Sequence, residues 1–157
     1  MVTAHLVYGY LGAGKTTLAR ELAARHHAAL ISIDEWYLRL FTDATPTPHL
    51  DAEKWQRLAD LLHEHWPQIL RAGADVVLDL GLWSRADRDR ARAAATEAGA
   101  ECVLYWVRTD DETALARCLA RNSEPGASFI VDEAAYAQMR VRYDEPDADE
   151  AVEIITT

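Results

Sequence analysis

The sequence predicts an α/β domain in which a parallel sheet is covered by helices on both faces. Short, continuous apolar runs alternate with helical stretches of ten or more residues, which is typical of buried parallel strands joined by crossover helices. A glycine-rich turn separates the first apolar run from the first helical stretch. The 157 residues, half of them hydrophobic, suffice for one core and leave no room for a second domain. We therefore expect a single three-layer domain over residues 1–157 with about five strands.

Four apolar, β-prone runs predict the strands, and a fifth run near the end of the chain predicts an edge strand. The expected strands are 4–8, 28–33, 74–80, 101–107 and 151–156.

Helical periodicity fills the segments between these strands. Gly73 and Gly99 follow two of the helices, where a residue with positive φ commonly ends a helix. Pro67 is expected to kink or split the longest helix. Two irregular stretches, 41–49 with Pro46 and Pro48 and 122–130 with Pro125 and Gly126, are expected to form substrate-contacting loops or a lid. The expected helices are 16–25, 35–40, 50–71, 84–98 and 111–121.

Composition disfavours several classes of function. The formal net charge of -10 repels polyanions, so nucleic acid and anionic membranes are poor partners. Cys102 and Cys118 are too few for a disulfide framework or a cysteine-based zinc site, which favours a reducing compartment. The chain has no basic leader and no run of roughly 18 apolar residues. We expect a cytoplasmic protein, and the sequence does not indicate its oligomeric state.

The glycine-rich turn matches G-x-x-x-x-G-K-[ST] at every position, and it lies between a predicted strand and a predicted helix. Its backbone N–H groups and the helix N-terminus are suited to wrap phosphates, and Lys15 is suited to reach the β and γ phosphates. Thr16 is expected to offer its hydroxyl to Mg²⁺, so ATP and Mg²⁺ are the expected cofactors. The predicted nucleotide-binding residues are Gly9, Tyr10, Leu11, Gly12, Ala13, Gly14, Lys15, Thr16 and Thr17.

Three further segments carry a family resemblance: residues 32–36 (SIDEW), 77–85 (VLDLGLWSR) and 117–122 (RCLARN). Together with the phosphate loop they resemble P-loop small-molecule kinases such as gluconate and shikimate kinases, chloramphenicol phosphotransferase, zeta toxins and polynucleotide 5'-kinase. The closest resemblance is to bacterial kinases labelled AAA-type ATPases. It implies a P-loop NTPase fold with a short lid, and transfer of the γ-phosphoryl of ATP to a hydroxyl of a small molecule.

Two acids at predicted strand ends are candidate site residues. Asp34 follows the second strand, at the edge where such sheets bind ligands, and the resemblance implies that it accepts or orients the proton of the attacking hydroxyl. The alternative is a helix N-cap. Asp79 ends the third strand in a pattern resembling the Walker B element, where an acid holds Mg²⁺ or contacts substrate. The division of work between Asp34 and Asp79 stays open, and Asp75, at the opposite edge, is expected to be a turn residue.

Phosphoryl transfer requires cations besides Lys15 and Mg²⁺. Arg117 and Arg121 lie four residues apart near the end of a helix and resemble lid arginines, with a solvated helix face as the alternative. Arg85 and Arg88 are weaker substrate candidates, since they can equally form surface pairs with nearby aspartates. The remaining substrate candidates are Arg39, which is as well explained as a surface residue, and Trp36 and Trp83, which are otherwise expected in the core.

Two other sequence patterns are not expected to take part in metal binding or catalysis. His63 and His65 are two apart, so on a helix they do not share a face and are not expected to bind metal. The acidic segment 143–150 corresponds to a region that passes the adenine base in the resembled kinases, but its carboxylates are expected only to aid solubility.

Two alternatives to a small-molecule kinase remain. One is an ATP-binding regulatory or stress protein with slow hydrolysis and a protein partner. The other is a polynucleotide 5'-kinase, which the net charge of -10 disfavours.

Overall fold

The computed structural model describes residues 1–41, 50–124 and 129–157. Within these ranges the elements follow the predicted α/β alternation, with one additional helix before the last strand. In chain order they are β1 (Thr3–Gly9), α1 (Lys15–His26), β2 (Ala29–Ser32), α2 (Ile33–Phe41), α3 (Ala52–Arg71), β3 (Val76–Asp79), α4 (Arg85–Glu97), β4 (Glu101–Arg108), α5 (Asp111–Arg121), α6 (Glu133–Arg140) and β5 (Glu153–Thr156).

The five strands form one parallel sheet in the order β2-β3-β1-β4-β5. β1 is central, with His5 level with Val77 of β3 on one side and Val103 of β4 on the other. β5 pairs with β4 at the sheet edge, as predicted. Because all strands run the same way, their carboxyl ends meet at one edge, where parallel α/β sheets place their ligands.

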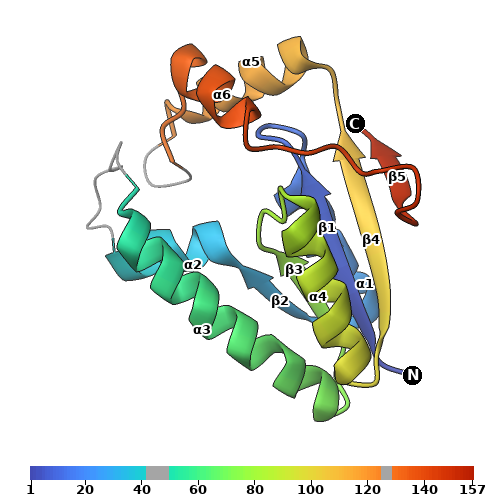
Figure 1. Ribbon diagram of the computed structural model, residues 1–157. Coiled ribbons are helices and arrows are strands. Elements are labelled where there is room, and N and C mark those ends of the chain that lie inside the picture. The colour runs from blue at the N-terminus through green and yellow to red at the C-terminus, as the bar shows by residue number, and fades with distance from the viewer. Residues whose placement is uncertain (42–49, 125–128) are drawn as a thin grey trace.

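Helices cover both faces of the sheet and give the expected three layers (Figure 1). α1 packs on one face through Ala19 and Leu22, against Val7 of β1 and Val77 of β3. α3 and α4 cover the other face, where Trp66 is among the fully buried side chains. α5 and α6 lie beyond the carboxyl ends of β1 and β4 (Figure 1). No described helix is long and apolar enough to cross a membrane.

The structure corrects three sequence expectations about element bounds. β2, β3 and β5 are each shorter than predicted, and β2 ends early because Ile33 already belongs to α2. Of the two predicted effects of Pro67, a kink or a split, the split is wrong, because α3 runs as one helix of 20 residues with Pro67 buried in it. Packing of the buried face of α3 compensates for the missing N–H hydrogen bond. The eight-residue α6 was not predicted, although Asp132 caps it by accepting a hydrogen bond from the N–H of Ala135.

Other expectations hold or lie outside the described residues. Gly73 and Gly99 follow the C-caps of α3 and α4 with φ of 91° and 75°, which confirms their role as helix ends. Residues 42–49 and 125–128, with Pro46, Pro48, Pro125 and Gly126, are outside the described residues, so the expected loops there are not described further.

A buried ion pair ties α4 to the segment before β5. Arg88 is fully buried, and two of its guanidinium nitrogens donate to the Glu150 carboxylate at 2.9 and 2.7 Å. Its third nitrogen donates to the carbonyls of Leu82, Trp83 and Asp144. Although burial alone would raise it, the hydrogen bonds that Glu150 accepts from Arg88 and Arg92 hold its pKa down to about 2. The pair therefore joins α4, the β3–α4 loop and the chain leading to β5.

The acidic segment 143–150 binds arginines of α4, so the expectation that its carboxylates serve only solubility is wrong. Besides the Glu150 pair, Arg85 bonds Asp147 at 2.9 Å and Asp149 at 2.8 Å. Arg85 also pairs with Asp89 one turn along the helix.

Replacing Arg88 by alanine should lower the free energy of unfolding by about 3–5 kcal/mol, because it removes the fully buried partner of the Glu150 carboxylate and leaves only the more exposed Arg92 to pair with it. Arg85→Ala is the matched control on the same helix, and its solvated ion pairs should contribute much less. Urea unfolding of both variants measures the difference. Equal losses would contradict the structural role given to the buried pair.

Candidate functional site

The phosphate loop packs tightly against the backbone of β4 and α5. At two of its glycines this packing leaves no space for a side chain. A Cβ on Gly9 would lie 2.4 Å from the carbonyl oxygen of Val107, and one on Gly12 would lie 2.2 Å from that of Ala114. Gly12 and Gly14 also have φ of 73° and 99°, which disfavour residues with a side chain. The loop conformation therefore requires glycine for steric as well as dihedral reasons.

The N-terminus of α1 opens directly from this loop. Gly14 is the N-cap and supplies no side-chain hydrogen bond, so the first N–H groups of α1 remain available to an anion. Lys15 extends back over the loop, where its ammonium donates to the Tyr10 carbonyl at 2.9 Å. Burial lowers the pKa of Lys15, while the carboxylates of Asp79 and Asp34 oppose that shift. A bound phosphate would replace the missing hydration of the ammonium.

Asp79 lies beside the loop at the end of β3. Thr16 donates its hydroxyl to Asp79 Oδ2 at 2.9 Å, and Ser32 donates to the same oxygen at 3.5 Å. A hydroxyl and a carboxylate oxygen this close are the hard oxygen ligands that Mg²⁺ prefers. The residues present therefore fit a magnesium ion held by Thr16, Asp79 and the phosphates of a nucleotide.

Asp34 lies in the first turn of α2, since that helix already begins at Ile33. Asp34 is exposed and lines the same cavity as Lys15. Desolvation of its carboxyl at this site raises the pKa of Asp34 to about 6, and Asp79 adds to the shift against the charges of Lys15 and Arg121. A carboxylate with this pKa is ionised at neutral pH and is more basic than an ordinary aspartate.

The two arginines of α5 face the site in different ways. Arg117 donates to Thr157 Oγ1 at 2.9 Å and to the Gly12 carbonyl at 3.4 Å, so it is bound to the phosphate loop itself. Arg121 makes a long contact of 3.4 Å to Cys118 Sγ and has no ion pair with a described carboxylate. Its charge acts on both Lys15 and Asp34.

A cavity of about 600 Å³ is lined by Lys15, Thr16, Asp34, Arg117 and Arg121, whereas Asp79 lies behind Thr16 and does not line it. One part of the cavity wall, formed by Phe129 and Val131, comes from the chain after α5 and was not predicted. Asn122 exchanges two hydrogen bonds with the backbone of Val131 and so folds this chain back over the site. An asparagine after a last-turn arginine is the only sequence signal for that turn, and it is a weak one. The predicted residues that line the cavity are Leu11, Gly12, Gly14, Lys15, Thr16, Thr17, Asp34, Arg117 and Arg121, and those not predicted are Leu18, Glu21, Ala120, Phe129, Val131, Ile155 and Thr157.

The other predicted substrate residues do not line this cavity, as far as the described residues show. Arg39 is exposed and pairs with Glu35 at 3.9 Å, and Trp36 is 40% exposed on α2. Trp83 packs its ring 5.7 Å from that of Tyr10. Arg85 and Arg88 are held by the acidic segment described above, which leaves both outside the cavity.

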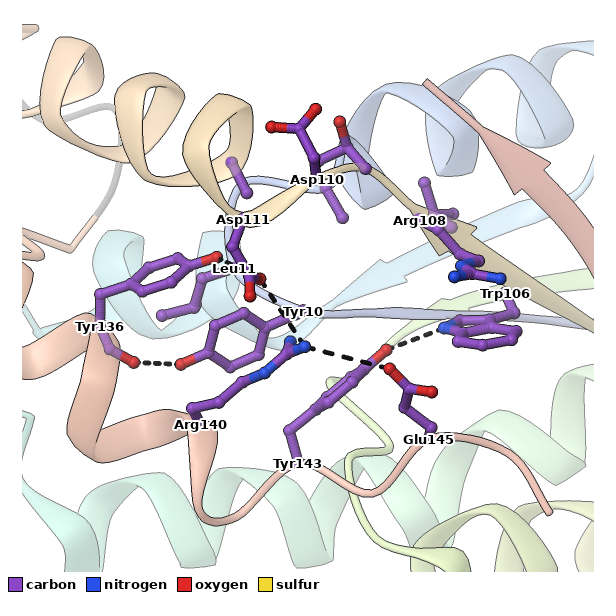
Figure 2. Close-up of a pocket in the computed structure, with 14 residues that line it drawn as sticks. Tyr10, Leu11, Trp106, Arg108, Asp110, Asp111, Tyr136, Arg140, Tyr143 and Glu145 are labelled. Atoms are coloured by element: carbon purple, nitrogen blue, oxygen red, sulfur yellow. Dashed lines mark hydrogen bonds and ion pairs between the residues drawn. The ribbon is translucent and has the colours of Figure 1, made fainter.

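Tyr10 of the loop does not line this cavity and lies in an aromatic cluster with Tyr136, Tyr143 and Arg140 (Figure 2). Tyr10 is buried and donates its hydroxyl to the Tyr136 carbonyl of α6. The Arg140 guanidinium lies 4.6 Å from the ring centre of Tyr10 and 5.1 Å from that of Tyr143. A second cavity of about 170 Å³ lies at this aromatic cluster, lined by Tyr10, Leu11 and Ala13 of the loop and by groups of β4, α5 and α6.

Comparisons with known proteins agree with this architecture. The model of the family described as AAA domain matches residues 5–146. No curated protein matches the chain in sequence.

The fold is similar to those of solved structures at low sequence identity. A candidate kinase from Chloroflexus aurantiacus superposes with a TM-score of 0.71 at 21% identity, over 99% of this chain and 84% of that chain. Kti12 from Chaetomium thermophilum, solved with ADP-AlF3, gives 0.70 at 18% identity, over 98% and 88%. A gluconokinase from Sinorhizobium meliloti 1021 gives 0.63 at 14% identity, over 99% and 81%. The predicted P-loop NTPase fold and the resemblance to P-loop kinases are thereby confirmed.

Lys15→Ala should weaken ATP binding by roughly 10- to 100-fold, the effect of losing a hydrogen bond to a charged group worth about 1.5–3 kcal/mol. The melting temperature should change little, since Lys15 contributes no core volume. Calorimetric titration with MgATP measures the affinity. Lys54→Ala is the matched control, because it removes the chain's other lysine from an exposed site on α3. Equal affinity in both variants would contradict the assignment of the phosphate site.

Proposed function

The chain belongs to the AAA domain family, and on that premise we propose that it is an ATP-dependent phosphotransferase acting on a hydroxyl of a small molecule. The observation that carries this proposal is the convergence of Lys15, Asp34 and Arg121 on one cavity beside the phosphate loop. Hydrolysis of ATP requires only a group that orients a water molecule. Transfer to a hydroxyl requires, in addition, space beside the carboxylate for the acceptor molecule.

The phosphate loop would hold the triphosphate through its N–H groups and the Lys15 ammonium. Mg²⁺ held by Thr16 and Asp79 would neutralise charge on the β and γ phosphates. This arrangement assigns Asp79 to the metal, since its Oδ2 already bonds Thr16. Asp34 then remains as the carboxylate for the acceptor.

Asp34 is suited to take the proton of the attacking hydroxyl. Its pKa of about 6 keeps it ionised at pH 7 while making it a stronger base than an aspartate in water. Its place in the first turn of α2, at the carboxyl edge of the sheet, allows it to face both the γ-phosphate and an acceptor in the cavity. As the oxygen attacks phosphorus and the bond to ADP breaks, the hydroxyl proton would pass to Asp34.

Arg121 is suited to stabilise the charge that develops on the transferring phosphoryl group. It has no ion pair with a described carboxylate, so no such contact must break before it engages the phosphate. Arg117 has a different task in this proposal, because its bonds to Gly12 and Thr157 hold the phosphate loop in place.

The acceptor is proposed to be a small molecule because the cavity is of ligand size and partly apolar. Phe129 and Val131 supply apolar surface opposite the charged groups, a mixture typical of small-molecule sites. The net charge of -10 disfavours a polynucleotide. A regulatory ATP-binding protein with a protein partner is the alternative, and the similarity of fold to Kti12, which was solved with ADP-AlF3, supports nucleotide binding in either case.

Asp34→Asn should bind MgATP normally but transfer phosphoryl to a hydroxyl acceptor roughly 10²- to 10⁴-fold more slowly, the range for general-base catalysis. Because asparagine has nearly the same size, the melting temperature should stay close to that of the parent. The acceptor is found by screening sugars, sugar acids, nucleosides and aminoglycosides for acceleration of ADP formation above basal hydrolysis. Glu35→Gln, one residue along α2, is the matched control. If no compound accelerates ATP use and Asp34→Asn leaves basal hydrolysis unchanged, the regulatory alternative is favoured instead.

Arg121→Ala should lower kcat by roughly 10² or more while changing the affinity for ATP far less, because its charge matters chiefly in the transition state. Steady-state kinetics and calorimetric titration separate the two effects. Arg142→Ala removes an exposed arginine near α6 as the control. A normal kcat in Arg121→Ala would remove this residue from the mechanism.

A further inference from the structure

Two histidines and an aspartate meet at the edge of the sheet opposite to the phosphate loop. His5 lies near the start of β1, His26 is the last residue of α1, and Asp75 directly precedes β3. Asp75 was expected to be only a turn residue, and the histidines carry no recognisable motif. The three residues are brought together because α1 returns the chain to the amino-terminal edge of the sheet.

The three side chains have the spacing of a metal site. One ring nitrogen of each histidine and one carboxylate oxygen of Asp75 all lie within 4.8 Å of one another. The rings of His5 and His26 have centroids 4.3 Å apart. Ligand atoms around a tetrahedral zinc ion are roughly 3.3 Å apart, given bonds of about 2.0 Å. Small rotations of the exposed His26 and the half-buried Asp75 would close the remaining gap.

A second, independent observation points to a ligand at this place. His5 is only 3% exposed, and its Nε2 is buried without a hydrogen-bond partner in the described part of the chain. A buried polar atom without a partner is costly. Coordination of a cation would use its lone pair.

The surrounding contacts orient the cluster as an outer shell does in metal sites. His5 Nδ1 lies 3.1 Å from the Tyr105 hydroxyl, which leaves Nε2 as the ligating nitrogen. The backbone N–H of Thr3 donates to Asp75 Oδ1 at 2.9 Å, which leaves the other carboxylate oxygen for an ion.

We propose that His5, His26 and Asp75 bind a divalent transition-metal ion of the Zn²⁺ class, with water as the fourth ligand. Two imidazoles and one carboxylate favour zinc over magnesium or calcium, which prefer oxygen ligands alone. The ion would join the C-terminal end of α1 to β1 and to the start of β3. It lies about 16 Å along α1 from Lys15, so it is separate from the nucleotide site and its proposed role is to stabilise the fold.

The test uses the full chain without nucleotide, stripped of metal and titrated with zinc chloride by calorimetry, with melting curves in parallel. The parent should bind one zinc ion per chain and melt at a higher temperature with zinc. His26→Ala and Asp75→Asn replace the more exposed ligands, so both should fold. Each should bind zinc more than roughly tenfold more weakly, since losing an outer-shell partner alone costs about 10- to 100-fold.

Two control variants separate this site from others. His27→Asn removes the neighbouring histidine, whose φ of 52° asparagine tolerates, and it should bind zinc like the parent. Asp79→Asn should also leave zinc binding unchanged, because it alters only the phosphate-loop site. The proposal is overturned if the parent binds no zinc, if His26→Ala binds it as tightly as the parent, or if Asp79→Asn abolishes binding.

Discussion

The site depends on the close approach of the phosphate loop to the backbone of β4 and α5. Because no side chain fits at Gly9 or Gly12, the loop descends onto Val107 and Ala114 and turns sharply into α1. That turn directs the first N–H groups of α1 and the Lys15 ammonium to one place. It also places α5, which carries the two arginines, directly against the loop. The binding of phosphate and the cations near it therefore share one steric cause.

Electrostatics then determine what the site can do. The protein is strongly acidic as a whole, yet its cavity at the phosphate loop gathers Lys15, Arg117 and Arg121 beside Asp34, and the charge of Asp79 also acts on Lys15. Limited hydration disfavours the charged forms of both the ammonium and the carboxyl group. For this reason the pKa of Lys15 is lowered and that of Asp34 is raised. A triphosphate and its cation would supply the missing charge compensation. The arrangement is thus matched to a ligand that carries several charges.

Local patterns predicted most of the fold, because continuous apolar runs, helical periodicity and the complete phosphate-loop motif are short-range signals. The predictions fail where contacts between residues far apart in the sequence determine the position of a side chain. Arg85 and Arg88 lie in the first turn of α4, in a segment that resembles a substrate site. Both instead form ion pairs with acidic residues more than 50 positions later, Arg85 with Asp149 and Arg88 with Glu150. The wall contributed by Phe129 depends on a turn held by Asn122. The His5 cluster has no motif, since its three residues meet only through the folded chain.

In the proposed reaction the γ-phosphoryl group passes to a hydroxyl compound rather than to water. The decisive measurement is turnover of ATP in water enriched in oxygen-18, with each hydroxyl compound present, followed by mass spectrometry of the phosphorus products. One compound should yield a phosphoester with no oxygen from water, in step with the ATP consumed. Inorganic phosphate bearing one heavy oxygen for every ATP consumed, whatever compound is present, would contradict the proposed reaction.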